Sequence, residues 1–69
     1  MAKQGKQIFG IPFDHIAVGE RAVIQTENGQ MLTSVVVAIR RVSRFSIEFE
    51  TQNTLYYLVY PEVVADFSA

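Results

Sequence analysis

The sequence predicts an all-β fold, a small barrel of four to five antiparallel strands, and three observations carry this prediction. Asn28 and Gly29 lie between two runs of strand-forming residues, where a tight hairpin turn is expected. The run 30–42 is long enough to bend between the two halves of a barrel, and the segment 44–51 alternates polar and apolar side chains. Because an open meander would leave two unpaired edges and a small core, the strands are expected to close on themselves.

The first half of the chain supplies a lead-in and a hairpin. The segment 7–13 is expected to be a short strand or an extended stretch, because Gly10 and Pro12 interrupt it and proline cannot donate to a ladder. The hairpin predicts a primed turn with positive backbone angles at Asn28 and Gly29. The following strand contains SVVVAI, residues 34–39, which is apolar on both faces. This pattern is typical of a strand that is buried on both faces or that bends sharply.

The second half predicts two more strands. In the first of them Phe45, Ile47 and Phe49 are expected to face the core, and the residues between them to face water. The run TLYYLVY, residues 54–60, is the last strand, and the segment 61–67 after it is compatible with a short helical turn that has Pro61 in its first position. Residues 1–6 are expected to form a mobile N-terminal segment and residues 7–69 a single domain.

Size and composition make association with another chain the expected source of stability. A domain of 69 residues hides only about 60% of its unfolded surface. The chain has no cysteine and one histidine, His15, so neither disulfides nor a structural metal is expected, and no residue indicates a cofactor. The sequence shows neither a signal peptide nor a membrane span, which predicts a soluble protein with a cytoplasmic localisation and no membrane partner.

The last strand predicts the surface through which chains associate. Tyr56, Leu58 and Tyr60 alternate along it with apolar residues of the opposite face, and only one of these faces can lie in the core. The other face needs a cover, which could be the N-terminal IFGIPF, the C-terminal VVADF or a second copy of the chain. The residues predicted for an oligomer interface are Leu55, Tyr57, Val59, Val35 and Val37.

No constellation of catalytic residues is evident, so the sequence favours a non-enzymatic protein. Asp14 and His15 are interpreted as a turn or capping pair, and the serines have no nucleophile elbow around them. The glycines are scattered and form no phosphate-binding loop.

A basic and aromatic cluster predicts the alternative, a surface for nucleic acid. Arginine binds phosphate while aromatic rings stack on bases, which is how small barrels bind single strands. The same tyrosines could instead be packing residues, and the arginines a solvated turn. The candidate ligand or nucleic-acid surface comprises Arg40, Arg41, Arg44, Tyr56, Tyr57 and Tyr60.

Several short motifs resemble small SH3-like barrels of bacteria and their mobile elements. Gly19 to Arg21 and Val59 to Pro61 are similar to plasmid-borne type II dihydrofolate reductases, in which four barrels surround a pore that the last strand lines. This resemblance implies a pore position for Tyr60, and Leu58 stands where that family carries a glutamine for the pterin and nicotinamide amides.

A second resemblance is to the bacterial Sm-like RNA chaperone. It is carried by Asn28 and Gly29 in the first hairpin and by Asn53, Thr54 and Tyr60 near the last strand. It implies a uracil-binding pore, with Pro61 and Glu62 at the positions where that family has a lysine and a histidine.

These observations together predict a non-enzymatic binding or protein-interaction module that acts as a homo-oligomer or with a protein partner. The alternative is a small Sm-like barrel that binds single-stranded RNA or DNA. A third candidate is an oligomeric pore enzyme resembling the type II reductases.

Overall fold

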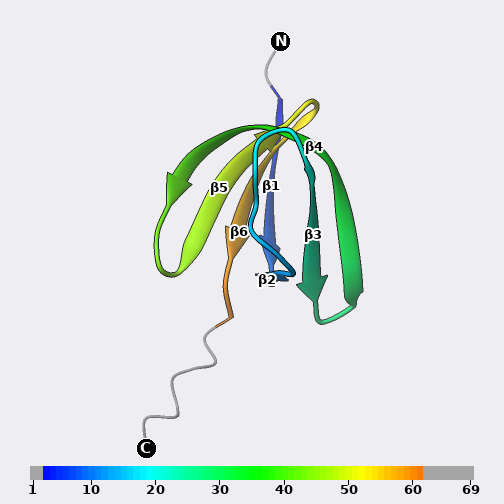
Figure 1. The fold of residues 1–69 in the computed structure, drawn as a ribbon. Coiled ribbons are helices and arrows are strands. Elements are labelled where there is room, and N and C mark those ends of the chain that lie inside the picture. Colours follow the sequence, from blue (N-terminus) through cyan, green and yellow to red (C-terminus); the bar gives the residue numbers. More distant parts are fainter. Residues whose placement is uncertain (1–2, 62–69) are drawn as a thin grey trace, which may run out of the picture.

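The computed structural model describes residues 3–61 as one strongly curved sheet (Figure 1). The prediction of an all-β protein is confirmed, since these residues contain strands and turns but no helix. In the described range there is accordingly no helix that could cross a membrane. The sheet order is β1-β6-β5-β4-β3-β2, and the strands are β1 (Gln4–Phe9), β2 (Ile11–Pro12), β3 (Arg21–Thr26), β4 (Gly29–Val42), β5 (Ser46–Thr51) and β6 (Thr54–Val59).

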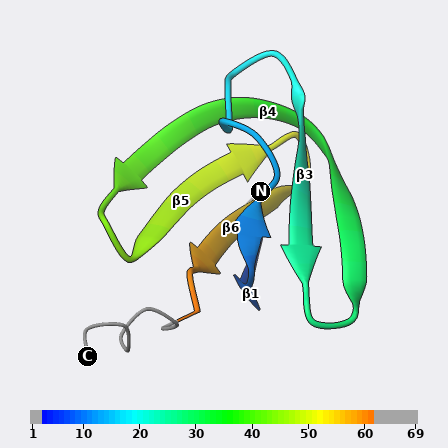
Figure 2. The same ribbon diagram turned by 60° about the horizontal axis from the view of Figure 1, so that its bottom comes forward.

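Strand β4 is the long bent strand that the sequence predicted. Its first half pairs with β3 as far as Val35, and its second half pairs with β5 from Val36 onward. Two irregularities in the β4–β5 register, one on each side of Ala38 and Ile39, add curvature, because bulges increase the local twist of a strand. Figures 1 and 2 show β4 arching over the molecule, so that β3 and β5 lie on its two limbs.

The number of strands, their direction and their closure differ from the prediction. The sheet has six strands instead of four to five, and β1 runs parallel to β6. Strands β1 and β2 follow each other in the chain but stand at opposite ends of the sheet order without pairing, so the sheet is not closed. Strand β1 begins at Gln4, before the domain start at residue 7 that the sequence indicated, because backbone pairing with β6 forms this strand and its polar side chains give no strand pattern.

Gly10 links the two ends of the sheet. Its N–H donates a 3.1 Å hydrogen bond to the carbonyl oxygen of Val59 in β6. A Cβ atom at this position would lie 2.5 Å from the carbonyl oxygen of Gln25 and 3.0 Å from Cγ2 of Ile24, both in β3. The chain therefore passes so close to β3 that only glycine fits without a shift of the backbone.

The turn between β3 and β4 is not the primed turn that the sequence predicted. Thr26 pairs with Gly29, which leaves Glu27 and Asn28 as the central residues, and neither has a positive φ. The positive φ, 118°, belongs to Gly29 immediately after the turn. The Thr26 hydroxyl accepts the N–H of Asn28 at 3.1 Å and donates to the Gly29 carbonyl oxygen at 2.8 Å, so a side chain stabilises a turn with no left-handed central residue.

The core lies on the concave face of the sheet. Its fully buried apolar side chains are those of Ile24, Val36, Phe49 and Leu58. The predicted alternation along β5 is confirmed for Ile47 and Phe49, which are buried.

Of two expectations at the ends of strands, one was wrong and the other stays a prediction. Phe45, predicted to face the core, precedes β5 and is exposed, because the turn before the strand carries its side chain away from the core. The predicted helical turn at 61–67 lies outside the described residues, apart from Pro61.

Candidate functional site

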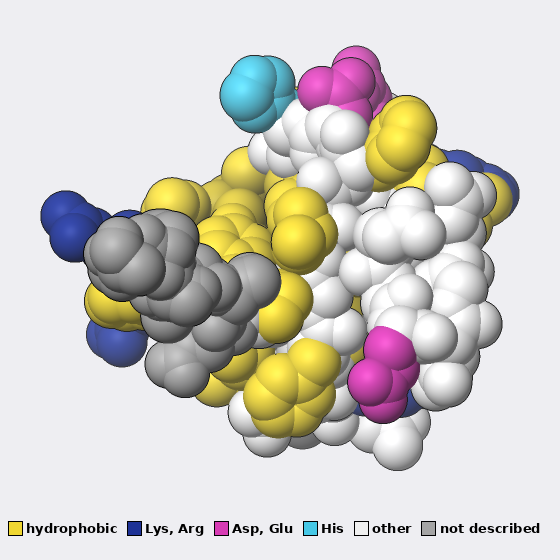
Figure 3. All heavy atoms as spheres, turned by 90° about the horizontal axis from the view of Figure 1, so that it is seen from below, with side chains coloured by type: hydrophobic (Ala, Val, Ile, Leu, Met, Phe, Trp, Pro, Cys, Tyr) yellow, Lys and Arg dark blue, Asp and Glu magenta, His cyan; other side chains and the backbone are white. Residues whose placement is uncertain are grey.

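An apolar groove of about 560 Å³ opens where the concave face is incompletely covered. Figure 3 shows this end of the molecule, on which hydrophobic side chains gather toward one side while the other side is mostly polar. The residues that line the groove are Ile11, Pro12, Phe13, Asp14, His15, Ile16, Ile39, Val42, Ile47 and Tyr60.

One wall of the groove is the end of the core face of β4 and β5. Ile39 lies opposite Phe49 and Val42 lies opposite Ile47, so the register puts all four side chains on the concave face. Phe49 and Ile47 are buried, whereas Ile39 is 37% exposed and Val42 is 68% exposed. The apolar face of β4 therefore continues beyond the part of the core that other strands cover.

The other wall comes from β2 and the segment after it. Ile11 is 51% exposed and Phe13 is 69% exposed. Their backbone is fixed, because β2 pairs with β3 and the N–H of Phe13 donates a 2.8 Å hydrogen bond to the carbonyl oxygen of Val23. The backbone that carries these apolar side chains is therefore held by hydrogen bonds, while the side chains themselves are exposed to water.

The rim of the groove is polar. The backbone N–H of His15 donates to Oδ1 of Asp14 at 2.8 Å, which agrees with the interpretation of this pair as a turn. Arg44, two residues after Val42, lies in the turn beside this rim and forms no ion pair with any residue of the range 3–61. Arg41 belongs to the opposite, convex face of β4, where it lies across from Glu48. Within the same range no three His, Cys, Asp or Glu side chains come together to hold a metal ion.

A tight turn beside the groove presents another exposed aromatic ring, that of Phe45. The hydroxyl of Ser43 accepts the N–H groups of Phe45 and Ser46 at 3.2 Å and 3.1 Å, and the N–H of Ser43 donates to the Ser46 carbonyl oxygen at 2.8 Å. The Phe45 carbonyl oxygen accepts the N–H of Tyr60 at 2.9 Å, which joins the turn to the residue that lines the groove.

The structure does not bring the predicted tyrosines onto one surface. Tyr56 is buried on the concave face, Tyr57 points to the opposite face and is 43% exposed, and Tyr60 packs against the edge of the core. Of the predicted arginines, Arg40 is paired with an acidic side chain, and Arg41 lies directly opposite Glu48 in the sheet. Arg44 is exposed in the turn that carries Phe45.

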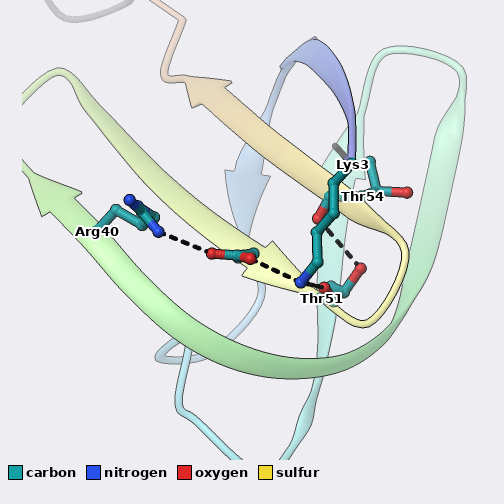
Figure 4. Close-up of polar contacts among 5 residues, drawn as sticks. Lys3, Arg40, Thr51 and Thr54 are labelled. Atoms are coloured by element: carbon teal, nitrogen blue, oxygen red, sulfur yellow. Dashed lines mark hydrogen bonds and ion pairs between the residues drawn. The ribbon is translucent and has the colours of Figure 1, made fainter. Parts of the chain in front are cut away.

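An ion cluster forms around Glu50, which shares the convex face with Leu55 and does not line the groove. Figure 4 shows its contacts. Glu50 accepts from Lys3 Nζ at 2.6 Å and from Arg40 Nη1 at 3.0 Å, while Lys3 Nζ also donates to the Thr51 carbonyl oxygen at 2.7 Å. The Lys3 ammonium, and after it the Arg40 guanidinium, hold the pKa of Glu50 below its ordinary value of 4.5. The cluster connects the chain before β1 with β4 and β5.

The residues predicted for an oligomer interface fall into two groups. Leu55, Tyr57 and Val59 share the convex face of β6, where Leu55 and Val59 are half-buried. Val35 and Val37 are exposed on β4, on either side of the bend where its partner changes from β3 to β5. Strand β5 separates the two groups in the sheet.

Sequence reasoning missed most of the groove. Only Tyr60 was a predicted site residue, whereas Ile11, Phe13, Ile39 and Val42 were not. The available signal was the apolar stretch IFGIPF, one of the predicted covers for β6, which passes from β1 into β2 and one wall of the groove. Leu58, at the position of the reductase glutamine, is fully buried in the core.

Comparisons with known proteins do not extend this description. No protein-family model, no curated protein and no solved structure matches the chain.

Proposed function

We propose that this protein is a non-enzymatic protein-interaction module of the SH3-like kind, whose groove holds an apolar segment of a partner protein. The observation that supports this proposal is the exposure of Ile11, Phe13, Ile39 and Val42 around one groove. Fully burying a side chain of this size is worth about 1.5 to 3 kcal/mol. A partner that covers the groove gains part of this free energy at each of the four positions.

The charges beside the groove favour a segment that carries acidic residues next to its apolar ones. Arg44 stands in the turn just after Val42 without an ion-pair partner in the described part of the chain. The one carboxylate that lines the groove, Asp14, is engaged by the backbone of His15 at the opposite wall. An extended segment with its acidic residues toward the end of β4 would therefore match both walls.

A displayed peptide library tests this proposal. Peptides selected on the wild-type protein are expected to combine bulky apolar residues with Asp or Glu, and to lose binding to Val42→Asp and Phe13→Ser. Leu32→Asp is the matched control, because Leu32 is also an exposed apolar residue of β4 but does not line the groove. Selected peptides that bind Val42→Asp as tightly as they bind the wild-type protein would refute the proposal.

The chain's own residues 62–69 are a competing occupant, because the segment EVVADFSA follows the groove residue Tyr60 and is itself acidic and apolar. A variant that ends at Pro61 distinguishes the two cases. If a partner segment is the occupant, the selected peptides should bind this variant with unchanged affinity. A large gain in affinity would assign the groove to residues 62–69 instead.

A single-stranded nucleic acid is the second candidate, and the turn beside the groove is the observation that favours it. Arg41, Arg44 and the exposed ring of Phe45 lie within five residues of one another, which is the combination of cation and stacking ring that single strands require. Fluorescence anisotropy with a labelled oligonucleotide tests this candidate. Binding that weakens as salt increases and is lost in Phe45→Ala would support it over the peptide groove.

A further inference from the structure

We propose that a second copy of this chain pairs with the free edge of β1, antiparallel and about a twofold axis at Gln7. This surface is separate from the apolar groove, so the proposal does not depend on what the groove binds.

Strand β1 has an unpaired edge within the described residues. It pairs with β6 on one side only, and β2, which continues from it, already pairs with β3. All residues of β1 except Ile8 are exposed. An exposed strand edge carries a row of unpaired N–H and C=O groups, which is a template for another strand.

The backbone direction at Gly10 identifies the groups on this edge. The N–H of Gly10 points to Val59 in β6. Because backbone groups alternate in direction along a strand, the N–H and C=O groups of the even-numbered residues of β1 also point to β6. Gly5, Gln7 and Phe9 therefore direct their N–H and C=O groups away from β6. These three residues present six backbone groups to an added strand.

Only one antiparallel register of two β1 strands uses all three residues without a repulsive contact. A register centred on Lys6 would place Lys6 opposite itself, and like charges directly opposite each other are destabilising. A register centred on Ile8 would place Gly5 opposite Ile11, which is already paired with β3. A register centred on Gln7 places Gly5 opposite Phe9 of the second copy and Lys6 opposite Ile8.

The side chains fit the register centred on Gln7. Gly5 and Phe9 align with Leu55 and Val59 of β6, so both lie on the convex face, where the ring of Phe9 is exposed. Nothing lies within 4 Å of the position that a Cβ of Gly5 would occupy. The ring of Phe9 from the second copy can therefore cover Gly5 and reach Leu55, an arrangement in which an aromatic side chain compensates for a glycine on the neighbouring strand.

A single cysteine tests the register, because the chain has none of its own. Residues opposite each other in a hydrogen-bonded antiparallel pair have Cα atoms about 5.5 Å apart, which is within the range that a disulfide spans. Gln7→Cys is therefore expected to form a disulfide-linked dimer rapidly under mild oxidation. Gln52→Cys, at an exposed position in the β5–β6 turn, is the control and should cross-link much more slowly. Equal rates for the two variants would overturn the register.

Sedimentation equilibrium tests the pairing itself. The wild-type protein is expected to show twice the mass of one chain at micromolar concentration, and Gln7→Pro the mass of one chain, since proline removes an N–H that faces the second copy. The melting temperature of dilute Gln7→Pro should stay close to that of the wild-type protein, whereas Lys6→Pro, which removes an N–H facing β6, should lower it. A wild-type mass of one chain, or an undiminished mass for Gln7→Pro, would overturn the proposal.

Discussion

The rings of Phe49 in β5 and Tyr56 in β6 stack on the concave face with their centroids 5.1 Å apart and their planes inclined by 25°. This contact decides which side of β6 is the core side, because both of its faces are apolar in the sequence. Tyr56 and Leu58 point inward, and Tyr57 consequently points to the convex face beside Glu48 and Gln7. Two adjacent tyrosines therefore have opposite roles.

The stack predicts a large difference between alanine substitutions at these two tyrosines. Tyr56→Ala should lower the free energy of unfolding by about 3 to 5 kcal/mol, because it leaves a cavity beside Phe49. A domain of this size has only a few kcal/mol in total, so the variant is expected to be largely unfolded. Tyr57→Ala should cost less than about 1 kcal/mol, since its side chain is partly exposed. Urea denaturation followed by circular dichroism measures both values.

Tyr56→Phe is the control for this comparison, because it keeps the stacked ring and removes only the hydroxyl. It should retain most of the stability that Tyr56→Ala loses. Equal losses in Tyr56→Ala and Tyr57→Ala would show that β6 does not present Tyr56 to the core.

The parts of the fold that could be predicted are those with a clear pattern of side chains. The alternation in β5 identified Ile47 and Phe49 as core residues, and the length of β4 indicated its bend. The extended stretch expected at 7–13 covers the end of β1 and all of β2. The start of β1 and its partner could not be predicted, because QGKQIF has no alternation and its pairing with β6 joins segments about 50 residues apart in the chain. The turn type was missed because the asparagine and glycine suggested a primed turn, whereas the side chain of Thr26 stabilises a different one.

A second prediction on stability concerns Gly10, where a larger side chain would be excluded by steric contact and not by the backbone angles. Gly10→Ala should destabilise the protein by about 1 to 3 kcal/mol, because the new methyl group would collide with the backbone of Gln25 in β3. Gly5→Ala is the matched control, since nothing lies near its Cβ position. Thermal unfolding of the two variants at low concentration compares them. An unchanged midpoint for Gly10→Ala would mean that the chain at Gly10 does not pass as close to β3 as described.

Gly29 predicts an effect of backbone conformation at the β3–β4 turn. Its φ of 118° lies where side chains are rarely tolerated, although there is open space around it. Gly29→Val should therefore cost about 1 to 3 kcal/mol through strain alone. Asn28→Ala should cost much less, because Asn28 has no positive φ. Equilibrium denaturation would contradict this assignment if Asn28→Ala proved the more damaging change.

The ion cluster at Glu50 predicts a dependence of stability on pH. The pKa of Glu50 is lower in the folded protein than its ordinary value of 4.5, so the folded state favours the charged form. Its contribution is fully present above pH 4.5 and is lost as the pH falls through the lowered pKa of the folded state. The difference in stability between the wild-type protein and Glu50→Gln should therefore shrink as the pH falls below 4.5.

The partners of Glu50 supply the control for this titration. In a Lys3→Met, Arg40→Met background the two cations are removed, so Glu50→Gln should no longer change the pH dependence. Denaturation midpoints between pH 7 and pH 3 would measure all four proteins. If the effect of Glu50→Gln on stability still depends on pH in this background, the pKa shift must come from groups other than Lys3 and Arg40.

The candidate site was less predictable than the fold because its residues come from distant segments. Ile11 and Phe13 lie near the start of the chain and Ile39 and Val42 near its middle, and only the pairing of β2 with β3 and of β4 with β5 brings them around one groove. The exposure of these residues could not be predicted either, because an apolar residue at the end of an apolar strand has the sequence pattern of a core residue. Val42 shares its face with Ile47 and is nonetheless mostly exposed.

This combination of apolar character and exposure gives the last prediction, which concerns Val42. A buried valine cannot be replaced by aspartate without a large loss of stability, since the charge would be desolvated. Val42 is 68% exposed, so Val42→Asp should change the free energy of unfolding by no more than about 0.5 kcal/mol. Val36→Asp, at a fully buried position of the same strand, should prevent folding altogether. If Val42→Asp unfolds the protein as Val36→Asp does, then Val42 belongs to the core and the groove is closed in solution; a folded Val42→Asp protein would show that the stability of the fold does not depend on this exposed apolar residue.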